Sequence, residues 1–140
     1  MNERFSVKLN REFSRAFKKG TRKGGRYLLI SAVRNRRELS RLGISVGKKF
    51  GNSVQRSRFK RLVREVFREL RPEIDGSYDI IVAARPSKRI AVKPSRKLRA
   101  EYIPNYNEIR TEMVKSFEIL GLIRREATTD INEKNNEGNQ

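Results

Sequence analysis

The sequence predicts an α/β (α+β) fold, a two-layer sandwich in which helices pack on a small mixed sheet. Two observations carry this class. The apolar residues of 53–70 repeat at helical spacing, whereas those of 41–47 alternate as they do in a strand. The periodic segments follow one another as helix, strand, strand, helix, strand, helix. A chain of 140 residues suits one domain with a real core, and we expect that domain to span residues 1–123.

Residues 10–19 are expected to form the first helix. Asn10 can cap its N-terminus, and Gly20 can end it. Phe13 and Phe17 lie four residues apart and therefore share one face of the helix. The residues alone favour a core position for both rings.

Two strands are expected next. Residues 21–26 are basic and glycine-rich, which indicates a flexible loop, and 27–34 form an apolar strand. Residues 35–39 then serve as a hairpin connection to the strand at 41–47. That second strand presents apolar and small side chains on opposite faces, Leu42, Ile44 and Val46 against Gly43, Ser45 and Gly47. A face of glycine and serine leaves room for something to lie against the sheet.

Residues 53–70 give the strongest helical pattern, and either Asn52 or Ser53 can cap it. The side chains predicted to face the core are Phe59, Leu62, Val63, Val66, Phe67 and Leu70. Basic residues fall every fourth position on another face, at Arg56, Lys60, Arg64 and Arg68.

The remainder of the chain is expected to contain one strand and one helix. Residues 71–77 break the basic helix, and 78–85 form a mostly apolar strand with at least one buried face. Residues 86–101 carry two prolines and many cations, which predicts a long loop that is a candidate for function. A last helix at 105–120 ends at Gly121 and turns Ile109, Met113, Phe117 and Leu120 inward. Residues 124–140 have little to bury and should be disordered.

Composition narrows the classes of function. Lys and Arg number 34 against 16 acids, a net charge of +18, which favours a polyanionic partner but leaves RNA, DNA and anionic membrane open. The chain has no cysteine and no histidine, so it lacks a thiol nucleophile, a thiolate metal site and the commonest general base. It also lacks a long apolar run and the apolar stretch of a signal peptide. We expect a soluble cytoplasmic protein whose side chains do little chemistry themselves.

The basic helix is the most informative segment. Glu65 and Glu69 are its only acids, against Arg56, Arg58, Lys60, Arg61, Arg64 and Arg68. A solvated charged face usually mixes signs to form pairs along the helix. The excess of guanidinium groups instead indicates a surface for closely spaced phosphates. Lys48 and Lys49 add cations beside the helix N-terminus. The spacing of this segment does not fit a P-loop.

These residues resemble the signature of a known family, the protein subunit of bacterial ribonuclease P. The positions in register run across a strand, a loop and a helix: Gly43, Val46, Lys48, Lys49, Gly51, Asn52, Val54, Arg56, Arg58, Lys60, Arg61, Arg64 and Glu65. Weaker similarity in "EFSRAFKKG" and "YDIIVAAR" extends the resemblance over roughly residues 9–86.

The resemblance implies both a fold detail and a division of labour. The fold detail is an uncommon left-handed crossover between the strand before the basic helix and the strand after it. In the family, an RNA subunit carries the catalytic magnesium ions, and the protein binds that RNA together with the single-stranded 5′ leader of precursor tRNA. No catalytic residue, protein-bound metal or small-molecule cofactor is expected.

Candidate contacts follow from the same resemblance. Those to the RNA subunit are Lys48, Lys49, Asn52, Arg56, Ser57, Arg58, Lys60, Arg61, Arg64 and Arg68. A cleft between the first helix and the open sheet face would hold the leader, with candidate contacts at Phe13, Phe17, Tyr27, Ser31, Ser45 and Arg85. The rings would stack on bases of any sequence. Phe17 is favoured for stacking and Phe13 for a mixed core and cleft role. The Gly43 and Ser45 face would form the floor, and Arg85 a rim charge.

Two departures from the family pattern matter, and beside the first of them Ser53 replaces a usual alanine. Ser57 stands where the family usually has asparagine, so it keeps a hydroxyl but loses the reach of the amide. Ser31 stands where an aromatic residue often faces the cleft, and Tyr27 is expected on the same face four residues earlier.

Other functions remain open at this point. The composition also suits another protein that binds structured RNA, for instance a ribosomal one. A self-sufficient nuclease would need metal ligands, for which Asp75 and Asp79 are candidates, although a turn and a strand start favour structural roles for them. A membrane-surface role is weakest, because the apolar stripe of 59–70 is needed for the core.

Overall fold

The computed structural model describes residues 5–85 and 103–124. The predicted loop at 86–101, and all but the first residue of the predicted tail at 124–140, lie outside these ranges. The helices and strands are α1 (Asn10–Lys19), β1 (Thr21–Gly24), β2 (Leu28–Arg34), β3 (Arg41–Ser45), α2 (Ser53–Leu70), β4 (Tyr78–Ala84) and α5 (Tyr106–Ile119). Short 3-10 turns, η2 (Lys48–Phe50) and η3 (Arg71–Glu73), flank α2.

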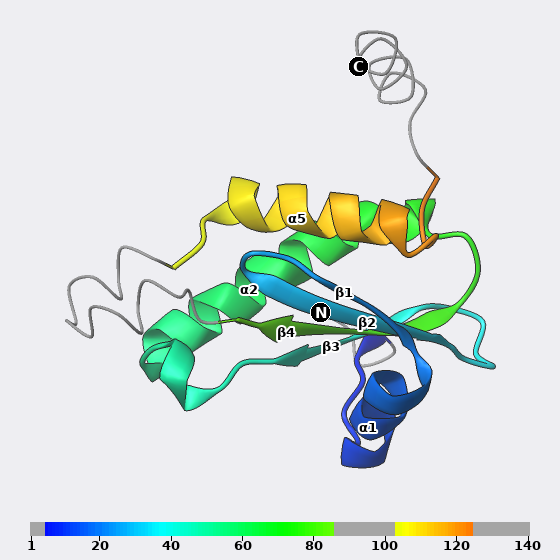
Figure 1. Cartoon of the computed structure of the whole chain (residues 1–140), viewed down its shortest axis with the longest axis horizontal. Coiled ribbons are helices and arrows are strands. Elements are labelled where there is room, and N and C mark those ends of the chain that lie inside the picture. Colours follow the sequence, from blue (N-terminus) through cyan, green and yellow to red (C-terminus); the bar gives the residue numbers. More distant parts are fainter. Residues whose placement is uncertain (1–4, 86–102, 125–140) are drawn as a thin grey trace, which may run out of the picture.

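The four strands form one mixed sheet in the order β1-β2-β4-β3. β1 pairs with β2 and β2 with β4 in antiparallel fashion, while β3 and β4 run parallel. Figure 1 shows α2 and α5 on one face of this sheet and α1 on the other. The predicted fold class, a small mixed sheet packed by helices, is confirmed. The left-handedness of the β3–α2–β4 crossover stays a prediction.

Two local predictions are wrong. Residues 35–39 do not close a hairpin, because β4 lies between β2 and β3 and pairs with both. β4 takes this central place because it is apolar enough to be buried on both faces. Residues 21–24, expected to be loop, form β1 at the edge of the sheet. Charged side chains are well tolerated on an edge strand, where they discourage pairing with other chains.

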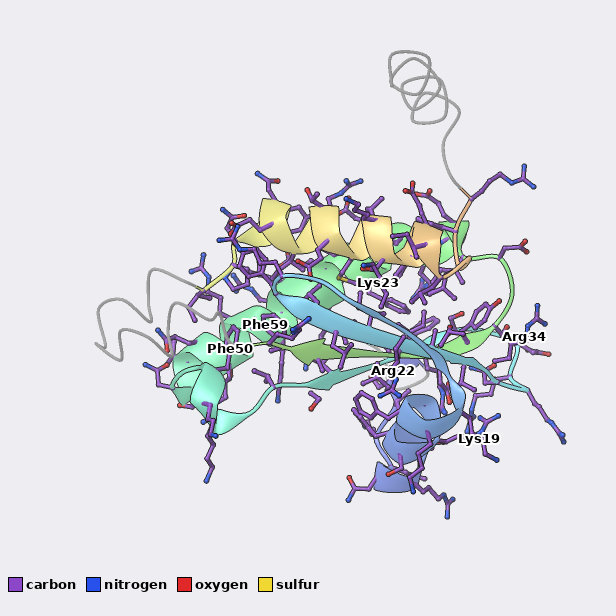
Figure 2. The ribbon with its side chains drawn as sticks, in the orientation of Figure 1. Lys19, Arg22, Lys23, Arg34, Phe50 and Phe59 are labelled. Atoms are coloured by element: carbon purple, nitrogen blue, oxygen red, sulfur yellow. The ribbon has the colours of Figure 1, made fainter. Side chains whose placement is uncertain are left out.

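The main core lies between the sheet and the pair α2 and α5. All six α2 side chains predicted to face inward are buried there. The rings of Phe50 and Phe59 pack with centroids 4.9 Å apart near the start of α2 (Figure 2). The Asn52 side chain caps α2 in a reciprocal capping box with Gln55. In α5, Ile109, Met113 and Phe117 are buried as predicted, Leu120 is half-buried, and Gly121 ends the last turn with a φ of 78°.

A smaller core lies under α1. It consists of Val7, Ala16 and Ile81, with Phe13, Phe17 and Val33 half-buried around it. The N-cap position belongs to Leu9, which makes no side-chain cap, so the expected cap by Asn10 is wrong. Gly20 does end α1. The position requires glycine, because a Cβ there would collide with the carbonyl oxygens of Ala16 and Ala32.

Candidate nucleic-acid interface

The outer side of α2 carries a row of cations with few partners. We call this surface the cationic face of α2; it comprises Arg56, Arg58, Lys60, Arg61, Arg64 and Arg68. Arg58, Arg61 and Arg68 are exposed and the other three are half-buried. Among the described residues, the only ion pair on this face joins Arg61 to Glu65 at 3.6 Å, both well exposed. Glu69 instead faces Arg110 of α5 at 3.5 Å. Six cations stand against these two carboxylates, so the face keeps a net positive charge.

The turn before α2 extends this positive surface. Lys48 and Lys49 are exposed in η2, while the adjacent Phe50 is buried and anchors the turn. The Asn52 side-chain oxygen accepts from the Gln55 backbone N–H at 2.8 Å, so its capping role occupies that oxygen. Ser57 is exposed, one residue from Arg56 and Arg58 along α2. All the residues predicted to contact the RNA subunit therefore lie on η2, on α2 or on the short connection between them.

The opposite sheet face is only partly covered. Across the four strands, Gly24, Leu29, Ala83 and Ser45 form one row, which we call the open row. Leu29 and Ala83 are half-buried and Ser45 is exposed. The next row, which includes Gly43, lies under α1, and a Cβ on Gly43 would collide with the Phe13 ring. The predicted cleft floor is thus divided, with Ser45 accessible and Gly43 covered.

Phe13 and Phe17 lie on α1 beside the predicted leader cleft. Both rings pack on the small core of Val7, Ala16 and Ile81, and both remain half-buried rather than fully buried. A half-buried ring is held in position by the core and still has a part of its surface available to a base. This geometry suits the mixed core and cleft role expected for Phe13, and it allows stacking at Phe17.

Tyr27 and Ser31 do not share a face. Tyr27 packs against the main core, and its hydroxyl donates to Glu108 Oε2 of α5 at 3.0 Å. Burial and this hydrogen bond raise the pKa of Tyr27. The prediction that Tyr27 and Ser31 share a face is wrong, because Tyr27 lies before the first residue of β2. Its backbone N–H donates to the Glu112 carboxylate, so its side chain does not follow the alternation of the strand. Ser31 does lie on the α1 face, but it is fully buried, and its Oγ has no hydrogen-bond partner among the described residues.

Two further cations stand at the edge of the open face. Arg85 is exposed, and its Nη1 donates to the Gly25 carbonyl at 2.8 Å. Arg22 lies in β1 opposite Ser31, which places it on the α1 face, and it is exposed (Figure 2). The sequence pattern did not reveal Arg22, because four residues of an edge strand are too short for a visible alternation.

A buried ion pair ties α1 to the sheet. Arg41 donates to both carboxylate oxygens of Asp79 at 2.9 and 2.8 Å, and to Glu12 Oε2 of α1 at 2.9 Å. Burial alone would raise the pKa of Asp79, but hydrogen bonds from Arg41 and Asn35 and the nearby arginine charges outweigh it, so that pKa is lowered. The hydrogen bond with Asp79 likewise raises the pKa of Arg41. Asp79 is thus occupied by a structural partner.

Neither a metal site nor a membrane-spanning segment is found in the described part of the chain. No group of three or more potential ligands gathers within residues 5–85 and 103–124. No helix in the same ranges is long and apolar enough to cross a membrane.

An open mixed sheet beside a strongly cationic helix suits a small protein that binds nucleic acid. Comparison with known proteins identifies the family to which the chain belongs. Residues 1–120 match the family model described as Ribonuclease P. The chain therefore belongs to the ribonuclease P protein family, as its residues suggested.

Individual relatives agree. A ribonuclease P protein component from Bacillus cereus (strain G9842) is 31% identical over 125 residues, which cover 89% of this chain and 97% of the relative. One from Oceanobacillus iheyensis is 42% identical over 90 residues, 64% of this chain and 74% of the relative. Among solved structures, the RNase P protein of Staphylococcus aureus matches with a TM-score of 0.67 and 29% identity, over 86% of this chain and 98% of that one. The RNase P protein of Thermotoga maritima matches with a TM-score of 0.64 and 30% identity, over 87% of this chain and 98% of that one.

Family membership settles the broad activity. Ribonuclease P is the ribonucleoprotein endoribonuclease that processes the 5′ ends of tRNA, and this chain is of the kind that forms its protein component. An RNA partner follows from that assignment.

Proposed function

We propose that the chain holds the catalytic RNA subunit through the cationic face of α2 and binds the 5′ leader of precursor tRNA in the cleft beside α1. The RNA subunit, with its magnesium ions, cuts the precursor to form the mature tRNA 5′ end. The observation that carries this proposal is the cationic face of α2, where six cations have one weak ion pair among the described residues.

The first half of the proposal rests on electrostatics. Guanidinium groups bind phosphates in bidentate fashion, and neutralising a phosphate releases counterions. The side chains opposite these cations along α2 are buried, so the helix is held at a fixed orientation. The cations are consequently presented on a rigid element, with Lys48 and Lys49 extending the row past the N-terminus.

The second half rests on the position of the cleft. α2 and the open row lie on opposite faces of the sheet, so one small domain can touch two RNAs at once. Leader contacts add to the affinity for the precursor without altering the chemistry, which is uniform binding. Mature tRNA has no leader and gains nothing, so product release stays fast.

The protein's own side chains are not assigned a chemical step. The chain has no histidine or cysteine, and Asp79, one of the two carboxylates considered as metal ligands, is bonded to Arg41. The proposed role is to bind and orient two RNAs, in the cytoplasm, while the RNA subunit supplies the metal ions. Precursor cleavage by the protein with no RNA subunit present would contradict this division.

The test compares two double variants that remove the same charge. Arg58→Ala with Arg61→Ala alters the cationic face of α2, whereas Arg110→Ala with Lys115→Ala alters the exposed side of α5. Each phosphate that is no longer neutralised should reduce the slope of log affinity for the RNA subunit against log salt by ~0.7–0.9. The α5 variant should change that slope less.

Circular dichroism should show that both proteins remain folded, because all four side chains are exposed. An unchanged slope in the folded α2 variant, or an equal change in the α5 variant, would contradict the assignment of α2.

A further inference from the structure

A second group of cations lies away from the cationic face of α2. It surrounds a hollow where α1 begins and the connection between β2 and β3 folds over the end of the sheet. We call this the arginine pocket; it is lined by Arg11, Arg15, Arg36, Arg37 and Arg41. Neither the sequence pattern nor the proposed RNA contacts assigned a role to it.

The pocket has a rigid floor. Arg41 is 7% exposed and is held by Asp79 and by Glu12, the two carboxylates that also line the hollow. Asn35 fixes the connection above it, because its amide donates to Asp79 Oδ1 at 2.8 Å and its oxygen accepts from the Arg37 backbone N–H at 3.0 Å. The floor is therefore already satisfied within the protein.

The remaining four arginines are exposed around this floor. Arg15 donates to the Arg34 carbonyl at 3.2 Å, which aims it at the end of the sheet that Figure 2 marks with Arg34. Arg37 lies 3.7 Å from Glu12, a long and exposed contact. Arg11 and Arg36 have no ion pair with any described residue. Both carboxylates are engaged by Arg41, so the four exposed guanidinium groups leave an excess of positive charge around the hollow.

The position of the pocket indicates which anion could reach it. Along α1, Arg11 and Arg15 follow one flank, whereas Phe13 and Phe17 follow the other, on the side of the proposed leader cleft. The Arg41 row and the open row of Ser45 lie on the same sheet face, about 13 Å apart at ~3.3 Å per strand residue. α2 is on the opposite face. A strand that leaves the cleft can therefore pass α1 and reach the arginine pocket, whereas an RNA bound to α2 lies across the sheet.

We propose that the arginine pocket binds backbone phosphates of the 5′ leader, upstream of the segment that lies in the cleft. This inference rests on the proposed binding of the leader beside α1. It adds a second, sequence-independent contact that only precursors with a long leader can reach.

The experiment uses the assembled holoenzyme and two precursor tRNAs, one with a long leader and one with a leader cut to a few nucleotides. Arg11→Ala with Arg36→Ala should weaken binding of the long precursor and reduce its salt slope by ~0.7 for each leader phosphate that the variant no longer neutralises. Binding of the short precursor, binding of mature tRNA and assembly with the RNA subunit should stay unchanged. A matched control, Lys115→Ala with Arg124→Ala, removes two exposed cations on the α5 side and should leave the long precursor's slope unchanged.

The outcomes separate this inference from the function on which it rests. If wild-type holoenzyme does not prefer precursor to mature tRNA, the leader cleft itself is wrong. If that preference is present but the pocket variant binds the long precursor as wild type does, the pocket is only solvated surface. Weakened assembly with the RNA subunit, or an equal loss of affinity for both precursors, would also overturn the assignment to the distal leader.

Discussion

The two faces of the central sheet are built for different purposes. On the α2 and α5 face, large apolar side chains such as Phe59, Phe67 and Phe117 are completely buried. On the α1 face, the buried apolar group among the described residues consists of Val7, Ala16 and Ile81. The same layer holds a buried ion pair and a serine hydroxyl that has no hydrogen-bond partner in the described part of the chain. One face supplies most of the apolar burial, and the other leaves part of the sheet uncovered and carries exposed charge.

β4 shows how one strand serves both faces. Ile80 and Val82 enter the main core, whereas Asp79 bonds to Arg41 and Ile81 supports α1. The alternation of a strand separates the two sets by one residue. Changes in the main core should therefore affect stability first, while changes near the open face should affect binding with a smaller loss of stability. Four predictions test this difference, in order of decreasing effect.

The largest effect is expected at Phe67, which has no exposed surface. Phe67→Ala should lower the free energy of unfolding by ~3–5 kcal/mol, because it removes buried packing and leaves a cavity. Denaturant unfolding measures this directly. A midpoint like that of wild type would mean that the main core does not carry the stability assigned to it.

The second prediction concerns how the stability of the fold depends on pH. The folded-state pKa of Asp79 is lowered, so the pair's contribution is fully present above the ordinary aspartate pKa of about 3.9. It is lost as pH falls from there through the lowered value, because the unfolded chain takes up the proton first. Asp79→Asn should be less stable at neutral pH and should lose that part of the acid dependence. Melting temperatures from neutral to acid pH provide the measurement, and parallel curves for the two proteins would contradict it.

The third effect separates binding from packing. Phe17→Ala should weaken precursor-tRNA binding to the holoenzyme by ~1–3 kcal/mol, the contribution of one stacked base. Mature-tRNA binding and assembly with the RNA subunit should stay nearly unchanged. Val33→Ala is a suitable control, because it trims another half-buried side chain on the same small core without removing a ring. If Phe17→Ala weakens binding of both tRNAs equally, the ring is a scaffold residue.

The smallest effect is expected at Ser31. Within residues 5–85 and 103–124 its buried Oγ finds no hydrogen-bond partner, and an unpaired hydroxyl disfavours the folded state. Ser31→Ala should leave stability unchanged or raise it by up to about 1 kcal/mol, since no hydrogen bond is removed. Thermal unfolding checks this, and a marked loss of stability would show that the hydroxyl has a partner in solution. Weaker precursor binding by the same variant would place Ser31 in contact with the leader.

The spacing of apolar residues correctly predicted the elements that bury a regular stripe of apolar side chains. The bounds of α2 and its six inward side chains agree with the structure, because a long amphipathic helix has one arrangement that hides its apolar face. The sequence also indicated the cationic face of α2, since its charges share that helix. The sequence pattern did not predict β1, which becomes a strand only because the edge of β2 is available to pair with it.

What the sequence determined by itself was the set of features contained within one segment: the periodic helices, the apolar strands, the excess of arginine and the signature around Gly43 to Glu65. Only the tertiary structure decided which segments meet. It placed β4 between β2 and β3, turned Tyr27 toward α5, covered Gly43 with Phe13, and gathered the arginine pocket from α1, the connection after β2 and β3. The physical reason is that strand pairing and helix packing are contacts between residues distant in the chain, and their free energy depends on partners that no local window contains.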